Sequence, residues 1–242
     1  MKIVKYNKIN GNKYEVYLEN NEKIKLYEDV ILKEELLLKK EIDDISKILE
    51  INSKYEIYEI ALKYLNHHVI SIKGMKDYLL KKKYVEEDVN KTIDKLIKNG
   101  YLNDSYFAKC YINDIIDLTN DGPLKIIKYL EDNNIEREVY SEILDKEDEI
   151  WFSRIKKYLE KQVKLNKKSS YYFKNKMMVN LINLGYEKEM INSCLSKITI
   201  DNQEELENIE KEKIRKKLEK KYSGNELERK IKEKLYQRGF FE

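Results

Sequence analysis

A regular series of positive charges lies between positions 154 and 168 of this sequence. Arg154, Lys157, Lys161, Lys164 and Lys168 follow one another at spacings of three, four, three and four. Because residues three and four apart share one side of an α-helix, this spacing predicts a single cationic stripe. The stripe could bind a phosphate backbone or an acidic protein surface. It could equally be the solvated face of a helix in a lysine-rich protein.

The opposite side of the same segment is apolar. Trp151, Ile155, Tyr158, Leu159 and Val163 recur at helical spacing. We therefore expect a helix with its apolar side turned inward and its basic side turned outward.

Two adjacent tyrosines follow this segment. Tyr171 and Tyr172 stand close to Lys174 and Lys176, a combination that could stack on bases and bind the strand that carries them. Because tyrosine also serves as a core residue, we expect at least one of the two rings to be buried.

Acidic residues form a second series with helical spacing. Asp114, Asp117 and Asp121 lie near the end of a predicted helix. They could hold a cation, but a partner-facing acidic surface is the favoured interpretation. The only two histidines, His67 and His68, are adjacent, so on a helix they point about 100° apart and do not share a ligand. We predict no metal site and no cofactor.

The sequence shows none of the common arrangements for catalysis. No nucleophile stands beside a base in a recognisable motif, no glycine-rich phosphate loop is present, and no pair of carboxylates is set in an apolar pocket. We therefore predict a binding protein and not an enzyme.

The elements that position these residues form a repeat. Lys83, Asn134, Gly185 and Gly239 each follow a leucine-containing helical turn and precede an apolar residue, at steps of 51, 51 and 54. Glycine and asparagine are typical of the left-handed residue that ends a helix, and the next apolar residue packs back onto the last turn. We therefore expect a helix to stop at each of these positions, and Gly100 to end another helix.

Acidic residues begin the helix after each stop, where they favour the positive end of the helix dipole. This charge also argues against a helix-turn-helix DNA reader, whose last helix approaches phosphates through its first residues. The acidic residues concerned are Glu86, Glu87, Asp88, Glu136, Glu138, Glu187 and Glu189.

Each repeat is predicted to contain three helices. Ser71 is expected to cap one helix, and Pro123 to occupy the first turn of another. The predicted fold class is mainly α, with tandem three-helix repeats stacked into an elongated, curved rod. The predicted divisions are an N-terminal segment at 1–52, three repeats at 53–101, 102–148 and 149–198, and a partial fourth repeat at 199–242.

The first residues differ from the rest. Polar and apolar residues alternate in "KYEVYLE" and "EKIKL", with Asn10-Gly11 and Asn20-Asn21 at turn positions. This pattern predicts a small antiparallel β-hairpin or three-stranded sheet. One helix, at about 28–40, is expected to cover it.

Charge separates the two central repeats. Residues 102–148 contain five basic and twelve acidic side chains, whereas residues 149–198 contain eleven and four. Cys110 and Cys194 stand alone in apolar patterns, so we expect buried free thiols. With no long apolar run and no signal-peptide pattern, we predict a cytoplasmic protein that does not enter a membrane.

Three stretches of this sequence resemble the RecX family of recombination regulators: "GYLNDSYFAKCYI", "DGPLKIIKYLEDNNI" and "ALKYLNHHVISIKGMKDYLLKKKY". The resemblance covers roughly residues 55–198. Departures occur at Ile70 and Ile72, where the family usually has arginine beside the serine, and at Lys83, where it often has glycine. The family pattern falls at Ala61, Leu65, Ser71, Leu79, Leu96, Gly100, Asp104, Phe107, Ala108, Gly122, Leu130 and Ile135.

The resemblance implies a non-enzymatic protein that binds the RecA recombinase filament on single-stranded DNA. It also implies inhibition of strand exchange, ATPase and co-protease activity, and so a role in homologous recombination, DNA repair and the SOS response. We expect a monomer. Two other hypotheses remain open, namely a stand-alone single-stranded nucleic-acid-binding module and a helical adaptor for another protein.

Overall fold

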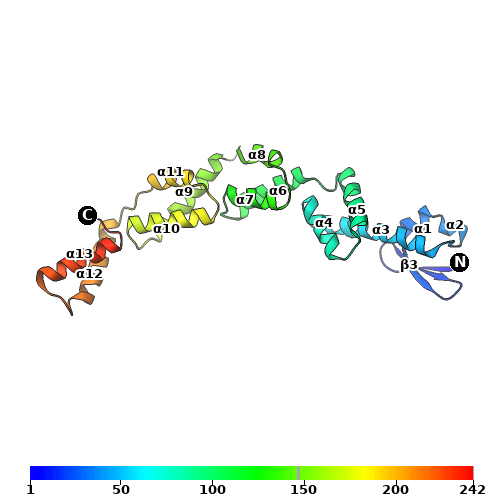
Figure 1. Cartoon of the computed structure of the whole chain (residues 1–242), viewed down its shortest axis with the longest axis horizontal. Coiled ribbons are helices and arrows are strands. Elements are labelled where there is room, and N and C mark those ends of the chain that lie inside the picture. Colours follow the sequence, from blue (N-terminus) through cyan, green and yellow to red (C-terminus); the bar gives the residue numbers. More distant parts are fainter. Residues whose placement is uncertain (146–147, 242) are drawn as a thin grey trace. The chain divides into compact units, whose positions relative to one another are not determined.

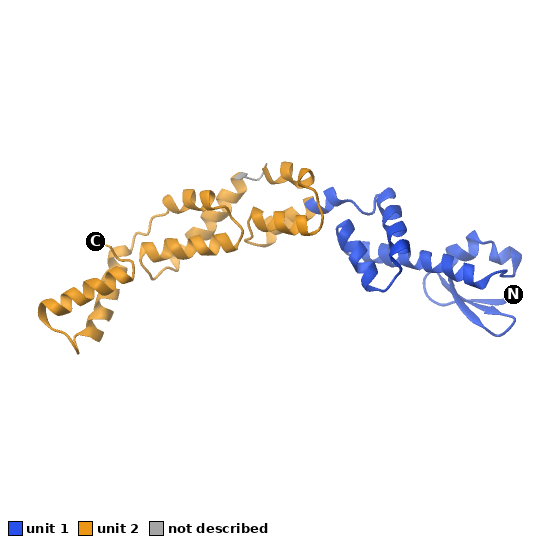
Figure 2. Cartoon of the chain, viewed as in Figure 1, with its two compact units in different colours: residues 1–108 blue, residues 109–242 orange. Residues whose placement is uncertain are grey.

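The computed structural model describes residues 1–145 and 148–241, which are mostly helical with a small sheet at the N-terminus (Figure 1). The mainly α fold class is confirmed, whereas stacking into a rod stays a prediction. The chain separates into two compact units, residues 1–108 and 109–242 (Figure 2). The strands are β1 Ile3–Lys8, β2 Lys13–Leu18 and β3 Lys23–Tyr27.

The N-terminal sheet is antiparallel in the order β1-β2-β3, as predicted. Its first turn contains Gly11 at φ 57° and its second contains Asn21 at φ 65°. These left-handed positions allow the tight reversals that join neighbouring strands. Val16 and Leu26 are fully buried on the face that meets the helices.

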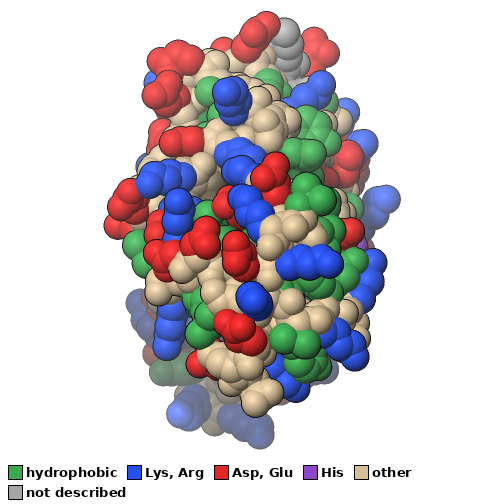
Figure 3. Space-filling view, turned by 90° about the vertical axis from the view of Figure 1, so that its right-hand side faces the viewer, with side chains coloured by type: hydrophobic (Ala, Val, Ile, Leu, Met, Phe, Trp, Pro, Cys, Tyr) green, Lys and Arg blue, Asp and Glu red, His purple; other side chains and the backbone are tan. Residues whose placement is uncertain are grey.

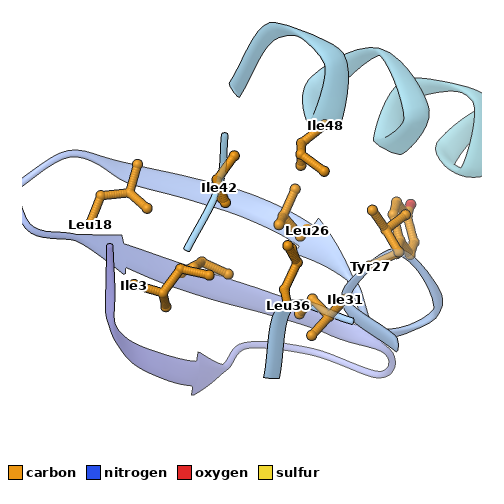
Figure 4. Packing of buried hydrophobic residues seen from close by; sticks show 10 residues of the cluster. Ile3, Leu18, Leu26, Tyr27, Ile31, Leu36, Ile42 and Ile48 are labelled. Carbon is orange, nitrogen blue, oxygen red and sulfur yellow. The ribbon is translucent and has the colours of Figure 1, made fainter. Parts of the chain in front are cut away.

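The prediction of one helix at 28–40 was wrong. The structure has α1 Glu28–Lys33 and α2 Leu36–Lys39, separated by Glu35 in the left-handed conformation at φ 56°. The break places Leu36 in the core beside Ile31 (Figure 4). Leu38 is left 82% exposed. Tyr6 in β1 donates a hydrogen bond to the Leu36 carbonyl oxygen at 2.9 Å. Tertiary packing therefore overrides a helical pattern here.

The next helix, α3 Ile45–Leu65, crosses the predicted division at 52/53. Asp44 caps it by accepting a hydrogen bond from the Lys47 amide at 3.1 Å. The five-part division of the chain stays a prediction.

The side chain of Asn52 joins α3 to β3. Its amide group accepts a hydrogen bond from the Tyr27 amide at 2.9 Å and donates one to the Lys25 carbonyl oxygen at 3.1 Å. Backbone groups on the outer edge of β3 are thereby satisfied.

Basic and acidic side chains are interspersed on the face shown in Figure 3, so neither sign of charge dominates that face.

The remaining helices follow the predicted triplets. In the first repeat α3 is joined by α4 and α5, whose apolar faces share one core around Ile57, Met75, Leu79, Ile93 and Leu96. The later helices continue the pattern, with two in the partial fourth repeat. Their bounds are α4 Ile72–Lys81, α5 Glu86–Lys98, α6 Asp104–Leu118, α7 Pro123–Asp132, α8 Arg137–Asp145, α9 Asp148–Lys164, α10 Ser170–Asn183, α11 Lys188–Ser196, α12 Gln203–Leu218 and α13 Gly224–Gln237.

Every predicted helix stop is confirmed by a left-handed backbone. The φ angles are 65° at Lys83, 77° at Gly100, 58° at Asn134, 88° at Gly185 and 78° at Gly239. At four of the stops the following amide closes the last turn with a hydrogen bond five residues back. These bonds join Tyr101 to Leu96 at 2.9 Å, Ile135 to Leu130 at 3.0 Å, Tyr186 to Leu181 at 3.1 Å, and Phe240 to Leu235 at 3.1 Å.

Candidate partner-binding surfaces

The residues that carry the family pattern have structural contacts. Ser71 is fully buried, and its hydroxyl caps α4 by accepting a hydrogen bond from the Gly74 amide at 3.0 Å. The Asp104 carboxylate accepts one from the Ile72 amide at 2.8 Å. Burial raises the pKa of Asp104, and the bond from Ile72 lowers it. Together Ser71 and Asp104 satisfy the first amides of α4.

The other family-pattern residues shape helix ends and cores. Phe107, Ala108 and Ile135 are buried, and Gly100 ends α5. Gly122 is the N-cap residue of α7, with Pro123 at the first helical position as predicted. Packing and helix capping explain why these residue types occur at these positions. None of these residues needs a contact with a partner to explain its presence.

Gly122 lies at a close junction between the second and third repeats. Its amide donates a hydrogen bond to the Leu184 carbonyl oxygen at 2.7 Å, and the Leu124 amide donates to Gly185 at 3.0 Å. A Cβ atom on Gly122 would lie 2.6 Å from the Gly185 carbonyl oxygen. Only glycine therefore fits at this point without a shift of the backbone.

Arg154, the first member of the predicted cationic stripe, points into the protein and not outward. Its guanidinium is set against the C-terminal end of α6, where helix carbonyls lack partners within the helix. Arg154 also donates to the Tyr186 hydroxyl at 3.4 Å. The guanidinium donates to carbonyl oxygens of Ile115 at 3.4 Å, Thr119 at 2.7 Å, Asp121 at 3.3 Å, and Ile116.

This arrangement explains why an arginine occupies position 154. Its planar fork can reach several carbonyls at once, and a positive charge suits the negative end of a helix dipole. Burial raises the pKa of the Tyr186 hydroxyl, and the neighbouring Arg154 lowers it. The outward orientation predicted for Arg154 was wrong, because contacts with α6 compete with solvent for its side chain.

The rest of the stripe is accessible. Lys157, Lys161 and Lys164 are exposed on α9, opposite the buried Trp151 and Leu159. The helix ends at Lys164, so Lys168 lies in the following loop and not on the helical stripe. The three helical lysines have no ion-pair partner among the described residues.

The tyrosine pair is more exposed than predicted. Tyr171 is 56% exposed and Tyr172 is 52% exposed, so the expectation that at least one is buried was wrong. Phe173 takes the core position instead, at 3% exposed. Lys176 is exposed and Lys174 is half-buried on the same helix, α10.

The acidic series is only partly a free surface. Asp114 and Asp117 are exposed on α6, whereas Asp121 is half-buried and pairs with Lys125 at 2.6 Å. Within the described residues, no group of three or more acidic, histidine or cysteine side chains is arranged to hold a metal ion. The acidic surface is therefore a candidate for charge complementarity, not for coordination.

The cysteines and histidines add no further site. Cys110 and Cys194 are free and half-buried, and burial raises the pKa of the Cys194 thiol. His67 and His68 are exposed, and the ring of His68 lies 4.3 Å from that of Tyr64.

Four cationic side chains were missed by sequence reasoning. Lys167, Lys213, Lys217 and Arg238 line one hollow with Lys168 and Tyr172. They come from the loop after α9, from α12 and from the end of α13. No periodic signal links segments so far apart along the chain. Only the local run Lys167-Lys168 could have pointed to this place.

Nearly the whole chain is similar to known proteins, although no protein-family model matches it. It is 26% identical to the "Regulatory protein RecX" of Halalkalibacterium halodurans, over 98% of this chain and 94% of that protein. It is 28% identical to the protein of the same name from Bacillus subtilis, over 96% and 91%. The Enterococcus faecalis protein of that name is 26% identical, over 98% and 92%.

Solved structures share the fold. A crystal structure of regulatory protein RecX superposes with a TM-score of 0.67 at 20% identity, covering 81% of this chain and 99% of that one. RecX from Lactobacillus salivarius gives 0.55 at 22% identity, covering 61% and 96%. Across the described residues no helix combines the length and apolar character that a bilayer crossing requires. The sequence similarity extends from the N-terminal sheet to the last helices, so the chain is similar to RecX proteins over nearly its whole length.

Proposed function

We propose that this protein regulates the RecA recombinase by binding RecA filaments on single-stranded DNA. The observation that carries the proposal is the similarity to proteins named regulatory protein RecX over 95–98% of the chain. It includes the N-terminal sheet and the partial fourth repeat as well as the three-helix repeats. Binding inhibits the recombinase, ATPase and co-protease activities of the filament.

The proposed mechanism is binding without catalysis. Tandem repeats present many similar surfaces in series, which suits contact with a polymer of repeating subunits. An acidic second repeat and a basic third repeat favour one register on a charged polymer, because a displaced register brings like charges together. The exposed Lys157, Lys161 and Lys164 and the exposed Asp114 and Asp117 are the candidate contacts. The protein acts as a monomer in the cytoplasm.

The decisive experiment measures RecA ATPase activity on single-stranded DNA while this protein is titrated in. We expect ATP hydrolysis to fall and to saturate at a ratio below one regulator per RecA subunit. A constant rate, with the protein shown to be folded by circular dichroism, would contradict the proposal.

A second candidate function is suggested by the exposed Tyr171 and Tyr172, since exposed rings beside lysines suit single-stranded nucleic acid. A stand-alone nucleic-acid-binding module would bind bare single-stranded DNA more tightly than it binds the RecA filament. A RecA regulator shows the opposite order. Anisotropy titrations against bare and RecA-coated oligonucleotide separate the two functions.

A further inference from the structure

A hollow with a basic lining lies where the loop after α9 meets α12 and the end of α13. Its volume is about 420 Å³, within the range of sites that bind small ligands. All of it belongs to the unit 109–242. The lining residues are Lys167, Lys168, Tyr172, Glu210, Lys213, Lys217, Gln237, Arg238 and Phe240.

The charges of this hollow do not balance. Among the described residues, Glu210 is the only acidic one in the lining, and it already pairs with Arg238 and, at 3.5 Å, with Lys213. Lys167, Lys168 and Lys217 have no carboxylate within ion-pair distance among the described residues. Three ammonium groups at one hollow repel each other, so a ligand with several negative charges would stabilise them.

The loop that presents two of these lysines is fixed before any ligand arrives. The Asn166 side chain accepts a hydrogen bond from the Lys168 amide at 3.1 Å and donates one to the Lys168 carbonyl oxygen at 2.7 Å. Buried Ser169 donates from its hydroxyl to the Arg238 carbonyl oxygen at 2.7 Å. Preorganisation of this kind lowers the entropic cost of binding.

An exposed aromatic ring completes the lining. Tyr172 is 52% exposed, and the ammonium of Lys168 lies 5.9 Å from the centre of its ring. The combination offers a flat surface for a base next to cations for its phosphate. An acidic peptide has no group that requires the ring.

The same residues continue into a second hollow, which indicates an extended ligand. This hollow has a volume of about 330 Å³ and also includes Lys167, Lys168 and Tyr172 in its lining. Lys176 contributes a further exposed cation there. A ligand that crosses the shared residues can occupy both hollows, as a strand with regularly spaced phosphates would.

We propose that the two hollows bind the sugar–phosphate backbone of single-stranded DNA, with one base stacked on Tyr172. The identity of the strand rests on the proposed function, which places this protein on filaments formed on single-stranded DNA. Lys167, Lys168 and Lys217 contact successive phosphates, and Lys176 extends the path. The site gives affinity without sequence preference, since it offers a ring and charges but no base-edge reader.

The test is fluorescence anisotropy of a labelled oligothymidine with the full-length protein over a range of salt concentrations. The variant tested, called the pocket variant below, carries Lys167→Glu, Lys168→Glu and Lys217→Glu. A neutral version carries Gln at the same three positions. For the neutral version, the slope of log K against log salt should fall by about 2, at roughly 0.7 for each phosphate that the variant no longer neutralises. Tyr172→Ala should weaken binding by about 5- to 150-fold, the range for loss of one stacked base.

Matched controls change the same charge elsewhere in the same unit. The charge control is one triple variant with Lys128→Glu, Lys188→Glu and Lys216→Glu, and these three lysines are exposed outside both hollows. The ring control, Phe152→Ala, removes a ring that is 41% exposed. The charge control should weaken binding much less than the pocket variant, and Phe152→Ala should leave it unchanged. Circular dichroism verifies that each variant is folded.

Three results would overturn the site. The first is equal binding by the pocket and control variants. The second is binding that Tyr172→Ala leaves unchanged while polyglutamate competes as well as DNA, which would identify an acidic-peptide site. The third is a wild-type protein that does not bind the oligonucleotide at all.

RecA ATPase measured in parallel separates this inference from the proposed function. If RecA is inhibited while the pocket variant binds DNA normally, only the site fails. If the pocket variant loses DNA binding but wild-type protein leaves RecA unaffected, only the proposed function fails.

Discussion

The hydroxyl of Ser169 donates a hydrogen bond at 2.7 Å to the carbonyl oxygen of Arg238, 69 residues further along the chain. Ser169 is the N-cap residue of α10, and Arg238 directly precedes the left-handed Gly239 that ends α13. The start of a helix in the third repeat is thus tied to a helix stop in the fourth. Gly122 and Leu184 form the same kind of junction between the second and third repeats. In each junction the acceptor is the backbone carbonyl oxygen of a helix C-cap residue.

Replacement of Gly239 tests how tightly this junction is packed. A Cβ atom there would lie 2.7 Å from the Ser169 hydroxyl, and Gly239 has φ 78°. We expect Gly239→Ala to lower the free energy of unfolding by about 2–5 kcal/mol, the sum of a left-handed strain of about 1–2 and a steric term of about 1–3. Urea unfolding followed by circular dichroism measures the loss.

Gly224→Ala is the matched control in the same unit. Gly224 also has a positive φ, 56°, but open space surrounds the position of its Cβ. Only the backbone strain of about 1–2 kcal/mol should remain. Equal losses of unfolding free energy at the two positions would show that glycine is needed at position 239 only for its backbone angle. The Ser169 side chain would then move aside without a measurable cost.

Arg154 is expected to act through stability and not through partner contact. Arg154→Met removes the guanidinium donor from carbonyl oxygens at and just after the C-terminal end of α6, so the free energy of unfolding should fall by about 2 kcal/mol or more. Arg154→Lys keeps the charge but loses the fork, and should recover only part of the loss. Urea unfolding of both variants, compared with Lys157→Met, gives the measurement.

Lys157 is the control because it is exposed on the same helix, one turn away. Its replacement should change stability by no more than about 0.5 kcal/mol. If Arg154→Met were as mild as Lys157→Met, the hydrogen bonds to α6 would carry little net energy.

Local signals explain what could be predicted from the sequence. The stop at Asn134 depends on a left-handed residue and the next apolar side chain, both visible in a short stretch, and so does the cap at Ser71. The repeat was therefore predictable, including the stop at Lys83, where a lysine adopts φ 65° without the help of glycine.

Contacts between distant segments explain what could not be predicted. The orientation of Arg154 depends on carbonyls 33 to 39 residues earlier in the chain. The interruption at Glu35 depends on how Leu36 fits against the sheet, although its local pattern is helical. Helical spacing identifies the side of a helix on which a residue lies, but not which neighbour occupies that side.

The three exposed lysines of α9 are predicted to contribute to filament binding. The variant with Lys157→Glu, Lys161→Glu and Lys164→Glu should retain its fold, since these side chains have no ion-pair partner among the described residues. Inhibition of RecA ATPase should then require a higher protein concentration, and the difference from wild type should shrink as salt screens the charges. The measurement is a titration of ATPase inhibition at several salt concentrations.

The control is the triple variant at Lys128, Lys188 and Lys216, which changes net charge equally. A shift of the same size in both variants would mean that total charge matters and the α9 lysines do not. No shift in either would remove the stripe from the mechanism altogether.

Asp104 is predicted to make the N-terminal unit less stable as pH rises. Burial raises the pKa of its carboxyl above the usual 3.8, so the folded protein holds a proton that the unfolded chain releases over the interval between the two pKa values. The stabilisation is complete below pH 3.8 and is lost as pH rises through the folded pKa.

Asp104→Asn keeps an acceptor for the Ile72 amide but cannot ionise, so the difference in unfolding free energy between variant and wild type should move in favour of asparagine as pH increases. Urea unfolding from pH 3.5 to 7 measures it, with Asp94→Asn on the exposed side of α5 as the control. A difference that is independent of pH would mean that the hydrogen bond from Ile72 balances burial in the folded protein, and one that moves in favour of aspartate would mean that it outweighs burial.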